Sequence, residues 1–231
     1  MYRAAQVFIK EGFSKLLRRL VGVFLGEVIL LKCPGTLRRQ LAVGVVMAVW
    51  VPAVGFGIQT LLRYANTPGR PATPPSRWPT GVPFPPAKQR STLVLFAHPQ
   101  CPCSRATIEE LARIESCCSQ KVETTVLFYA PSTMPSAWIK TDLWDSALRI
   151  PGVRVLADAG GTTARRFGVH TSGQTLLFDA SGRLVFNGGI TAFRGHSGDN
   201  DGRDEIVRLL RGETPLRHGT PVFGCALFEE E

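Results

Sequence analysis

Residues 93–111, LVLFAHPQCPCSRATIEEL, place two cysteines between a short apolar run and an amphipathic segment. The run, rich in Val, Leu and Phe, predicts a buried strand, and residues 104–115 carry apolar side chains at helical spacing. Cys101 and Cys103 are therefore expected where a strand leads into a helix. Unpaired backbone N–H groups and the helix dipole favour a thiolate there, and Arg105 is expected to add to this effect. Because a thiolate attacks disulfides and binds soft metals, the stretch predicts redox or metal chemistry.

The positive charge of the chain is concentrated at its N-terminus. The sequence has 27 Lys and Arg against 18 Asp and Glu, a net charge of +9. Residues 1–40 hold eight of the basic and two of the acidic residues, which leaves only +3 for the rest of the chain. This distribution is typical of an arm that orients a protein in a membrane. We expect no nucleic-acid partner.

An uncharged stretch of 22 residues follows the basic arm at residues 41–62, LAVGVVMAVWVPAVGFGIQTLL. About 20 apolar residues cross a bilayer as a helix, and Pro52 is tolerated in such a helix. The positive-inside rule then predicts that residues 1–40 are cytoplasmic and that the rest of the chain lies across the membrane. Residues 20–31 form a second apolar run, interrupted by Glu27, which we interpret as an interfacial helix. If this run also crossed the membrane, the domain that follows would be cytoplasmic.

The segment between the membrane and the domain is rich in proline. Eight prolines lie between Thr67 and Pro86. Proline fixes φ and has no N–H, so residues 63–90 are predicted to be an extended, semi-rigid spacer. One domain is expected at residues 91–214, with a C-terminal tail at 215–231.

Strands and helices are predicted to alternate within this domain. After the strand and helix that flank the cysteines, we expect strands at 123–129, 153–157, 175–178 and 183–187, and helices at 136–148, 162–167 and 200–211. The order βαβαβαββα predicts an α/β fold in which parallel strands are followed by a terminal hairpin.

The strand, cysteine turn and helix resemble the opening of a thioredoxin-like domain. The string HPQCPCSR at residues 98–105 resembles most closely the RedB group of membrane-anchored thioredoxin-fold proteins. Thioredoxins have C-x-x-C, whereas this chain has C-x-C. Two overlays on the family's pattern stay open. In the first, Cys101 matches the first cysteine and Ser104 takes the place of the second. In the second, Pro102-Cys103 matches the family's Pro-Cys, Gln100 takes the place of the attacking cysteine, and Cys101 fills an intervening position.

The resemblance implies a central mixed sheet flanked by helices, behind one transmembrane helix in a bacterial inner membrane, with the domain in the periplasm. It also places Gly173 where the family has a cis-proline beside the thiols, so Ser172 and Gly173 are expected to line the substrate groove. That proline ordinarily keeps metals off the thiols, and its replacement allows a metal to bind at Cys101 and Cys103. Glycine also permits close backbone approach, so a partner strand can still pair there.

Six cysteines are present, at positions 33, 101, 103, 117, 118 and 225. We assign no role to Cys33, on the arm. The other five face an oxidising compartment, where thiols tend to pair, and an odd number leaves at least one free or liganded. Cys117 and Cys118, at the far end of the helix, are expected to be one surface and one buried thiol. Cys225 is either a free tail cysteine or an auxiliary residue, as a resolving thiol or a further ligand.

The four histidines have different expectations. His98 is a base, a ligand or a turn residue, and His170 lies near the thiols if the Gly173 overlay holds. His196 belongs to a polar loop with a structural role, in which Asp199 or Asn200 caps the last helix. His218 is expected to be solvated.

Two functions follow from these residues. The first is a membrane-tethered thiol–disulfide oxidoreductase in which Cys101 or Cys103 attacks the disulfide of a protein near the membrane and the neighbouring thiol resolves the mixed disulfide, with no cofactor. The second is a copper-binding module built from Cys101 and Cys103 with His98, His170 or Cys225, because soft thiolates select Cu(I). A degenerate thioredoxin-fold scaffold is a third reading.

Overall fold

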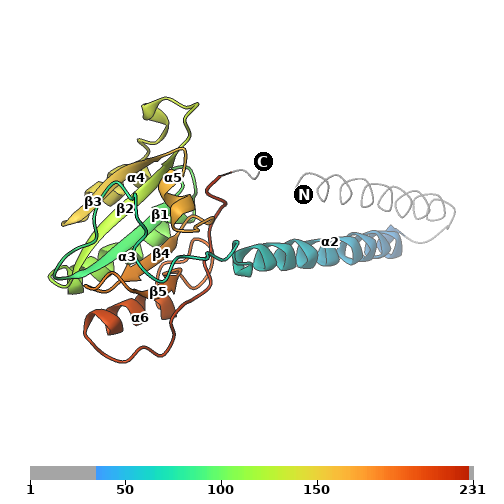
Figure 1. Ribbon diagram of the computed structural model, residues 1–231. Coiled ribbons are helices and arrows are strands. Elements are labelled where there is room, and N and C mark those ends of the chain that lie inside the picture. The colour runs from blue at the N-terminus through green and yellow to red at the C-terminus, as the bar shows by residue number, and fades with distance from the viewer. Residues whose placement is uncertain (1–34, 229–231) are drawn as a thin grey trace. The chain divides into compact units, whose positions relative to one another are not determined.

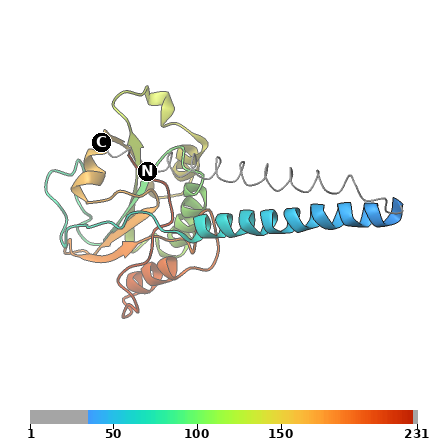
Figure 2. The ribbon, with the colours of Figure 1, turned by 90° about the vertical axis from the view of Figure 1, so that its right-hand side faces the viewer.

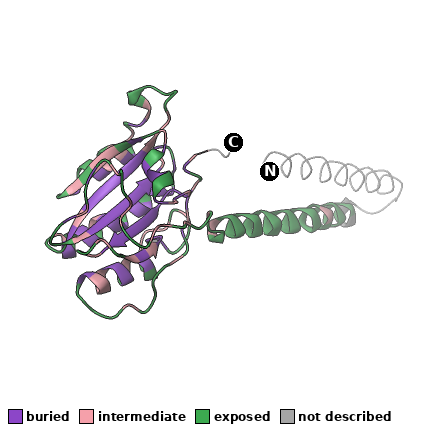
Figure 3. Cartoon of the chain, in the orientation of Figure 1, coloured by how far each residue is buried: buried purple, intermediate pink, exposed green. Residues whose placement is uncertain are grey.

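The computed structural model describes residues 35–228. The apolar run at 20–31 and Cys33 lie outside the described residues. The chain divides into two compact units after Ile58. Helix α2 spans Gly35–Asn66 and contains Pro52, so it extends beyond the predicted 41–62 at both ends. Its segment Arg38–Asn66 is long and apolar enough to cross a membrane and leaves its apolar side chains exposed, as the green ribbon of Figure 3 shows.

The second unit is built on one five-stranded sheet with the order β3-β2-β1-β4-β5. Strand β1 (Ser91–Ala97) runs parallel to β2 (Val122–Ala130), which runs parallel to β3 (Val153–Ala159). On its other side β1 pairs antiparallel with β4 (Gln174–Phe178), which forms a hairpin with β5 (Leu184–Gly188). The sheet can be followed in Figure 1. The predicted element order, with parallel strands followed by a hairpin, is confirmed.

Four helices complete the unit: α3 (Ser104–Cys118), α4 (Asp142–Leu148), α5 (Thr162–Arg166) and α6 (Asp201–Leu210). Successive side chains of β1 point to opposite faces of the sheet and so enter two separate cores. Leu93 and Leu95 pack with residues of α3, α4 and α6, whereas Val94 and Phe96 pack with residues of α5. Figures 1 and 2 show these elements in two views a quarter turn apart. Both faces of the sheet are therefore covered by helices.

The predicted helix at 136–148 is wrong in one respect, because the structure divides it. A single 3-10 turn spans Ser136–Trp138, and α4 begins only at Asp142. The break falls at Thr141, whose backbone is extended and whose Oγ1 donates a hydrogen bond of 2.9 Å to the carbonyl of Pro99. The helix is thus interrupted where Thr141 makes a tertiary contact to the cysteine turn.

The proline-rich segment packs on the domain where the sequence predicts a spacer. The backbone N–H of Thr73 donates to the carbonyl of Gly168 at 3.0 Å, and the backbone N–H of Trp78 donates to the carbonyl of Gly182 at 2.8 Å. The ring of Trp78 lies 5.1–5.6 Å from the rings of three phenylalanines, Phe84, Phe167 and Phe178. Burial of aromatic rings away from water is favourable, so residues 73–84 join the second core, the one that contains Val94 and Phe96, and are part of the folded unit.

Candidate functional site

The two cysteines of the C-x-C stretch occupy the tight turn between β1 and α3. The N–H of Cys101 donates to the carbonyl of His98 at 3.1 Å, and the N–H of Ser104 donates to the carbonyl of Cys101 at 3.0 Å. Cys103 stands at the N-cap position of α3. Both thiols are buried, and Cys101 exposes only 1% of its surface. The turn therefore fixes Cys101 just before a helix N-terminus and shields it from solvent.

A third cysteine reaches the same place from the C-terminal tail. The sulfurs of Cys101 and Cys225 lie 3.0 Å apart and share a hydrogen bond. The Sγ atoms of Cys101, Cys103 and Cys225 all lie within 4.8 Å of one another. All three are free thiols in this structure. The sequence offered two roles for Cys225, and the structure brings it into the cluster.

Ser172 and Gly173 lie directly beside the cysteine turn. The Oγ of Ser172 accepts from the N–H of His98 and shares a hydrogen bond with the hydroxyl of Ser104, both at 2.8 Å. The N–H of Gly173 donates to the carbonyl of Phe96 at 2.7 Å. Gly173 has a φ of +90°, which only glycine adopts without strain, and no peptide bond among the described residues is cis. Glycine thus lets loop 170–173 approach the thiols without the bend of a cis-proline.

The tail forms a short β-bridge with this loop. The N–H of Ser172 donates to the carbonyl of Cys225 and the N–H of Leu227 to the carbonyl of His170, both at 2.8 Å, with Thr171 opposite Ala226 in antiparallel register. A Cβ added at Gly224 would collide with the carbonyl oxygen of Ser172. The tail therefore occupies the backbone groups where the sequence led us to expect a partner strand.

The three thiols have strongly different acidities. The pKa of Cys101 is lowered to about 4, chiefly because its thiolate accepts a hydrogen bond from Cys225, with further help from Ser104; burial opposes the shift. The same hydrogen bond, together with burial, raises the pKa of Cys225 well above its usual range. Burial and the charge of Cys101 raise the pKa of Cys103, while Arg194 acts in the opposite direction. At neutral pH the cluster therefore holds one thiolate, on Cys101.

The cation beside the cysteines is Arg194 and not the predicted Arg105. The Arg105 guanidinium forms an exposed ion pair with Asp142, and Arg194 is the arginine that acts on the pKa of Cys103. Arg194 lies in the loop after β5 and donates from Nη1 to the carbonyl of Gly224, so it fixes the tail as well as facing Cys103. Nothing in the local pattern around Arg194 pointed to the thiols, since the loop was expected to serve only a structural role.

Comparisons with known proteins agree with this architecture. No protein-family model matches the chain, and no match was found among curated proteins. An uncharacterized conserved protein from Geobacillus kaustophilus is similar in structure, with a TM-score of 0.51, 18% identity and coverage of 71% of this chain and 93% of that one. A secreted Mycobacterium tuberculosis disulfide oxidoreductase matches with a TM-score of 0.39, 16% identity and coverage of 54% and 84%. A thioredoxin-like protein solved in its oxidized form matches with a TM-score of 0.43, 13% identity and coverage of 63% and 98%.

The fold is thioredoxin-like by its topology, because the sheet order β3-β2-β1-β4-β5 combines the parallel strands and the terminal hairpin expected of that class. The expected class is confirmed, namely a mixed sheet flanked by helices and preceded by one candidate membrane helix. In this thioredoxin-like fold the cysteine turn follows the central strand β1 and faces loop 170–173. The chain departs from the C-x-x-C pattern in two ways: Cys101 and Cys103 have C-x-C spacing, and the tail adds a third cysteine, Cys225.

The histidines stand outside the cluster of thiols. The Nδ1 of His98 accepts from the N–H of Gln100 at 3.2 Å, and its ring packs beside Tyr129 and Trp138. Burial lowers the pKa of His98, although the nearby Cys101 thiolate opposes the shift. His170 lies beside the ring of Phe228, and His218 is exposed, as predicted.

The polar loop before α6 is held by a buried carboxylate. Glu110, on α3, is fully buried and accepts hydrogen bonds from Ser197, Gly198, Asn200 and Arg203 at 2.7–3.2 Å. Asn200 also caps α6 by accepting from the N–H of Arg203, which confirms the predicted cap. His196, in this loop, stacks on Phe193. Glu110 follows Glu109 in the sequence, and nothing local distinguished the buried one.

Replacing Glu110 with Gln should lower the free energy of unfolding by about 2 kcal/mol, because the amide nitrogen cannot accept the hydrogen bonds that one oxygen of this buried carboxylate accepts. Thermal or denaturant unfolding of the full chain in detergent measures this change. Glu109→Gln is the matched control, since Glu109 is exposed on the same helix and should change stability by less than about 0.5 kcal/mol. Equal effects of the two substitutions would contradict the role of the network.

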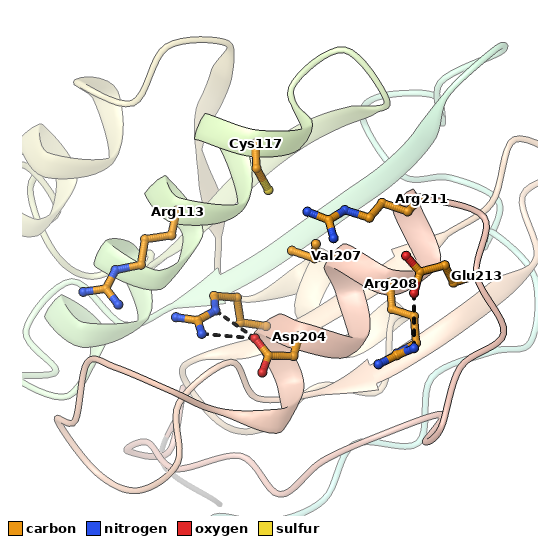
Figure 4. A pocket seen from close by; sticks show the side chains of 8 residues that line it. Arg113, Cys117, Asp204, Val207, Arg208, Arg211 and Glu213 are labelled. Carbon is orange, nitrogen blue, oxygen red and sulfur yellow. Dashed lines mark hydrogen bonds and ion pairs between the residues drawn. The ribbon is translucent and has the colours of Figure 1, made fainter.

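The remaining two cysteines of the domain lie at the other end of α3. Cys117 is exposed and Cys118 is buried, as predicted, with their sulfurs 2.8 Å apart. Burial and the neighbouring Cys117 raise the pKa of Cys118 to about 11. Cys117 lines a groove of about 480 Å³ between α3 and α6, together with four arginines, Arg113, Arg203, Arg208 and Arg211. Figure 4 shows Cys117 on α3 at this groove. Three of the four arginines are paired with Glu110, Asp204 or Glu213, so the groove carries little free positive charge.

Proposed function

We propose that this chain is a membrane-tethered thiol–disulfide redox protein whose working pair is Cys101 and Cys225. The contact of 3.0 Å between their sulfurs carries the proposal, because only a small approach separates the two thiols from a disulfide. When the reduced pair is reoxidised, the two sulfurs would form one S–S bond and pass two electrons, with the proton of Cys225, to the disulfide of a reoxidising protein. Cys103, within 4.8 Å, stays reduced beside them and completes the Cys-Pro-Cys site.

The direction of the reaction follows from the acidity of Cys101. A thiolate that is stabilised in the folded protein favours the reduced pair over the disulfide. The disulfide of such a pair is a strong oxidant. We therefore propose that the protein donates a disulfide to thiols of proteins near the membrane.

The membrane segment supports a location for this chemistry. Helix α2 has Arg38 and Arg39 near one end and Arg63 near the other, and the basic residues before it favour a cytoplasmic N-terminus. We propose a single-pass protein of a bacterial inner membrane with its thioredoxin-like domain in the periplasm, where disulfides persist. The resemblance of the string HPQCPCSR to the RedB group supports this location.

Peptide mapping tests the proposed pair. The full chain, purified in detergent, is oxidised with a small disulfide, alkylated and digested without reductant. We expect one reversible disulfide, joining the peptides that contain Cys101 and Cys225. A disulfide between Cys101 and Cys103, or two fully reduced thiols, would contradict the proposal.

The three clustered sulfurs also favour a second candidate function, the binding of Cu(I). Cys101, Cys103 and Cys225 supply soft donors close enough to share one ion, whereas His98 is not part of the group. Copper in this site would serve as bound cargo. Cys103→Ser separates the two functions: it removes a copper ligand but leaves the Cys101 and Cys225 pair. Weaker binding in an anaerobic Cu(I) titration, with disulfide formation unchanged, would favour copper; no stoichiometric binding by the unmodified chain would exclude it.

A further inference from the structure

The tail covers the sulfur that carries the negative charge. Cys101 exposes 1% of its surface, while Cys225 is half-buried. The backbone groups of loop 170–173 beside Cys101 are already paired with the tail through Ser172, Thr171 and His170. An extended peptide that approached Cys101 along this loop could not pair with the loop backbone, because the tail already forms those hydrogen bonds.

The tail is held in this position by several independent contacts. Val222 and Leu227 are buried, with 6% and 2% of their surfaces exposed, and Leu227 belongs to the core around Phe96. The guanidinium of Arg165 lies 4.3 Å from the centre of the Phe228 ring, and Arg194 donates to the carbonyl of Gly224. Moving the tail aside would expose apolar side chains and break these contacts, so opening of the site costs free energy.

We propose that partner thiols exchange with this site at the Sγ of Cys225, while the tail stays bound over Cys101. This inference rests on the proposed redox function and specifies which atom of the site meets the partner. Cys225 is the half-buried residue of the pair, whereas Cys101 exposes only 1% of its surface.

The chemistry of the step is consistent with this order of events. A partner thiolate attacks the Sγ of Cys225 in the Cys101–Cys225 disulfide, and the S–S bond breaks with its electron pair on Cys101. A second partner thiolate then attacks the partner's own sulfur in the mixed disulfide, and Cys225 leaves and takes up a proton. The partner's two thiols are oxidised to a disulfide and the protein's disulfide is reduced. Cys101 is the better leaving group of the pair, because it lies just before the N-terminus of α3, where unpaired backbone N–H groups and the helix dipole favour a thiolate.

A monothiol probe identifies the attacked sulfur in the unmodified protein. The full chain in detergent is oxidised, its thiols are counted, and it is mixed briefly with glutathione, quenched with acid and mapped by mass spectrometry. We expect at least ~10-fold more glutathione on Cys225 than on Cys101, because attack on Cys101 requires local opening of the tail. Glutathione mainly on Cys101 would overturn the inference. Absence of the Cys101–Cys225 disulfide in the first thiol count would instead overturn the proposed function.

A pair of tail variants tests whether the tail is the cause. Leu227→Ala removes a buried anchor and should lower the ratio of Cys225 to Cys101 adducts several-fold, by making opening easier. Leu216→Ala is the matched control, since Leu216 is 76% exposed in the same tail, and it should leave the ratio unchanged. An unchanged ratio in Leu227→Ala, when thermal unfolding shows that the variant is folded but less stable, would contradict shielding by the tail.

Discussion

Cys101→Ser should lower the rate of thiol–disulfide exchange by the full-length protein by at least ~100-fold, because it removes the one thiolate of the cluster at neutral pH. Without that sulfur, Cys225 has no nearby thiolate with which to form a disulfide. Cys103 does not replace it, because its pKa is raised. The rate is measured with a small chromogenic disulfide and with a reduced peptide substrate, in both directions.

The control for this loss is Cys117→Ser. Cys117 is an exposed thiol on the same helix, far along α3 from the turn, so its replacement removes a cysteine but not the site. Its exchange rate should equal that of the unmodified protein once non-specific reaction of the surface thiol is subtracted. If Cys101→Ser retains full activity, the oxidoreductase proposal fails, and a scaffold role for the fold becomes the better account.

Cys225→Ala should raise the pKa of Cys101 from about 4 towards the ordinary thiol value of about 8.5, because the hydrogen bond from Cys225 is the largest cause of the shift. The thiolate of Cys101 is followed by its ultraviolet absorbance during a pH titration of the reduced protein. In the unmodified chain the absorbance should persist down to about pH 4. In the variant most of it should vanish near neutrality. Cys118→Ala, which removes a distant buried thiol, should leave the titration at low pH unchanged.

The same shift fixes the sign of the pH dependence of stability. The pKa of Cys101 is lower in the folded than in the unfolded chain, so between about pH 4 and about 8.5 the unfolded state binds more protons. The thiolate's contribution to the stability of the reduced protein is therefore present above this window and is lost as the pH falls through it. Cys225, whose pKa is raised, contributes oppositely: its stabilisation is full at low pH and declines only above its unfolded value. Unfolding of the reduced protein from pH 4 to 8 should show this rise, and Cys225→Ala should flatten it.

The sequence by itself determined the features that depend on local pattern. Short apolar runs predicted the strands to within two residues, and their order predicted parallel strands with a terminal hairpin. The turn that carries Cys101 and Cys103 was predicted at the junction of β1 and α3, because a continuous apolar run is followed there by apolar side chains at helical spacing. The uncharged run with basic residues before it predicted the long apolar helix, since length and charge are local quantities.

Only the tertiary structure decided which distant residues lie beside the cysteines. Cys225 is 124 residues from Cys101, and periodicity reports which face of an element is apolar, not which distant segment covers it. Arg194 replaces Arg105 as the neighbouring cation because Asp142 binds Arg105, a pairing across 37 residues. Trp78 likewise joins the second core through rings far along the chain. These contacts form because burial of apolar surface and pairing of buried polar groups are satisfied over the whole fold at once, so no single stretch of sequence specifies them.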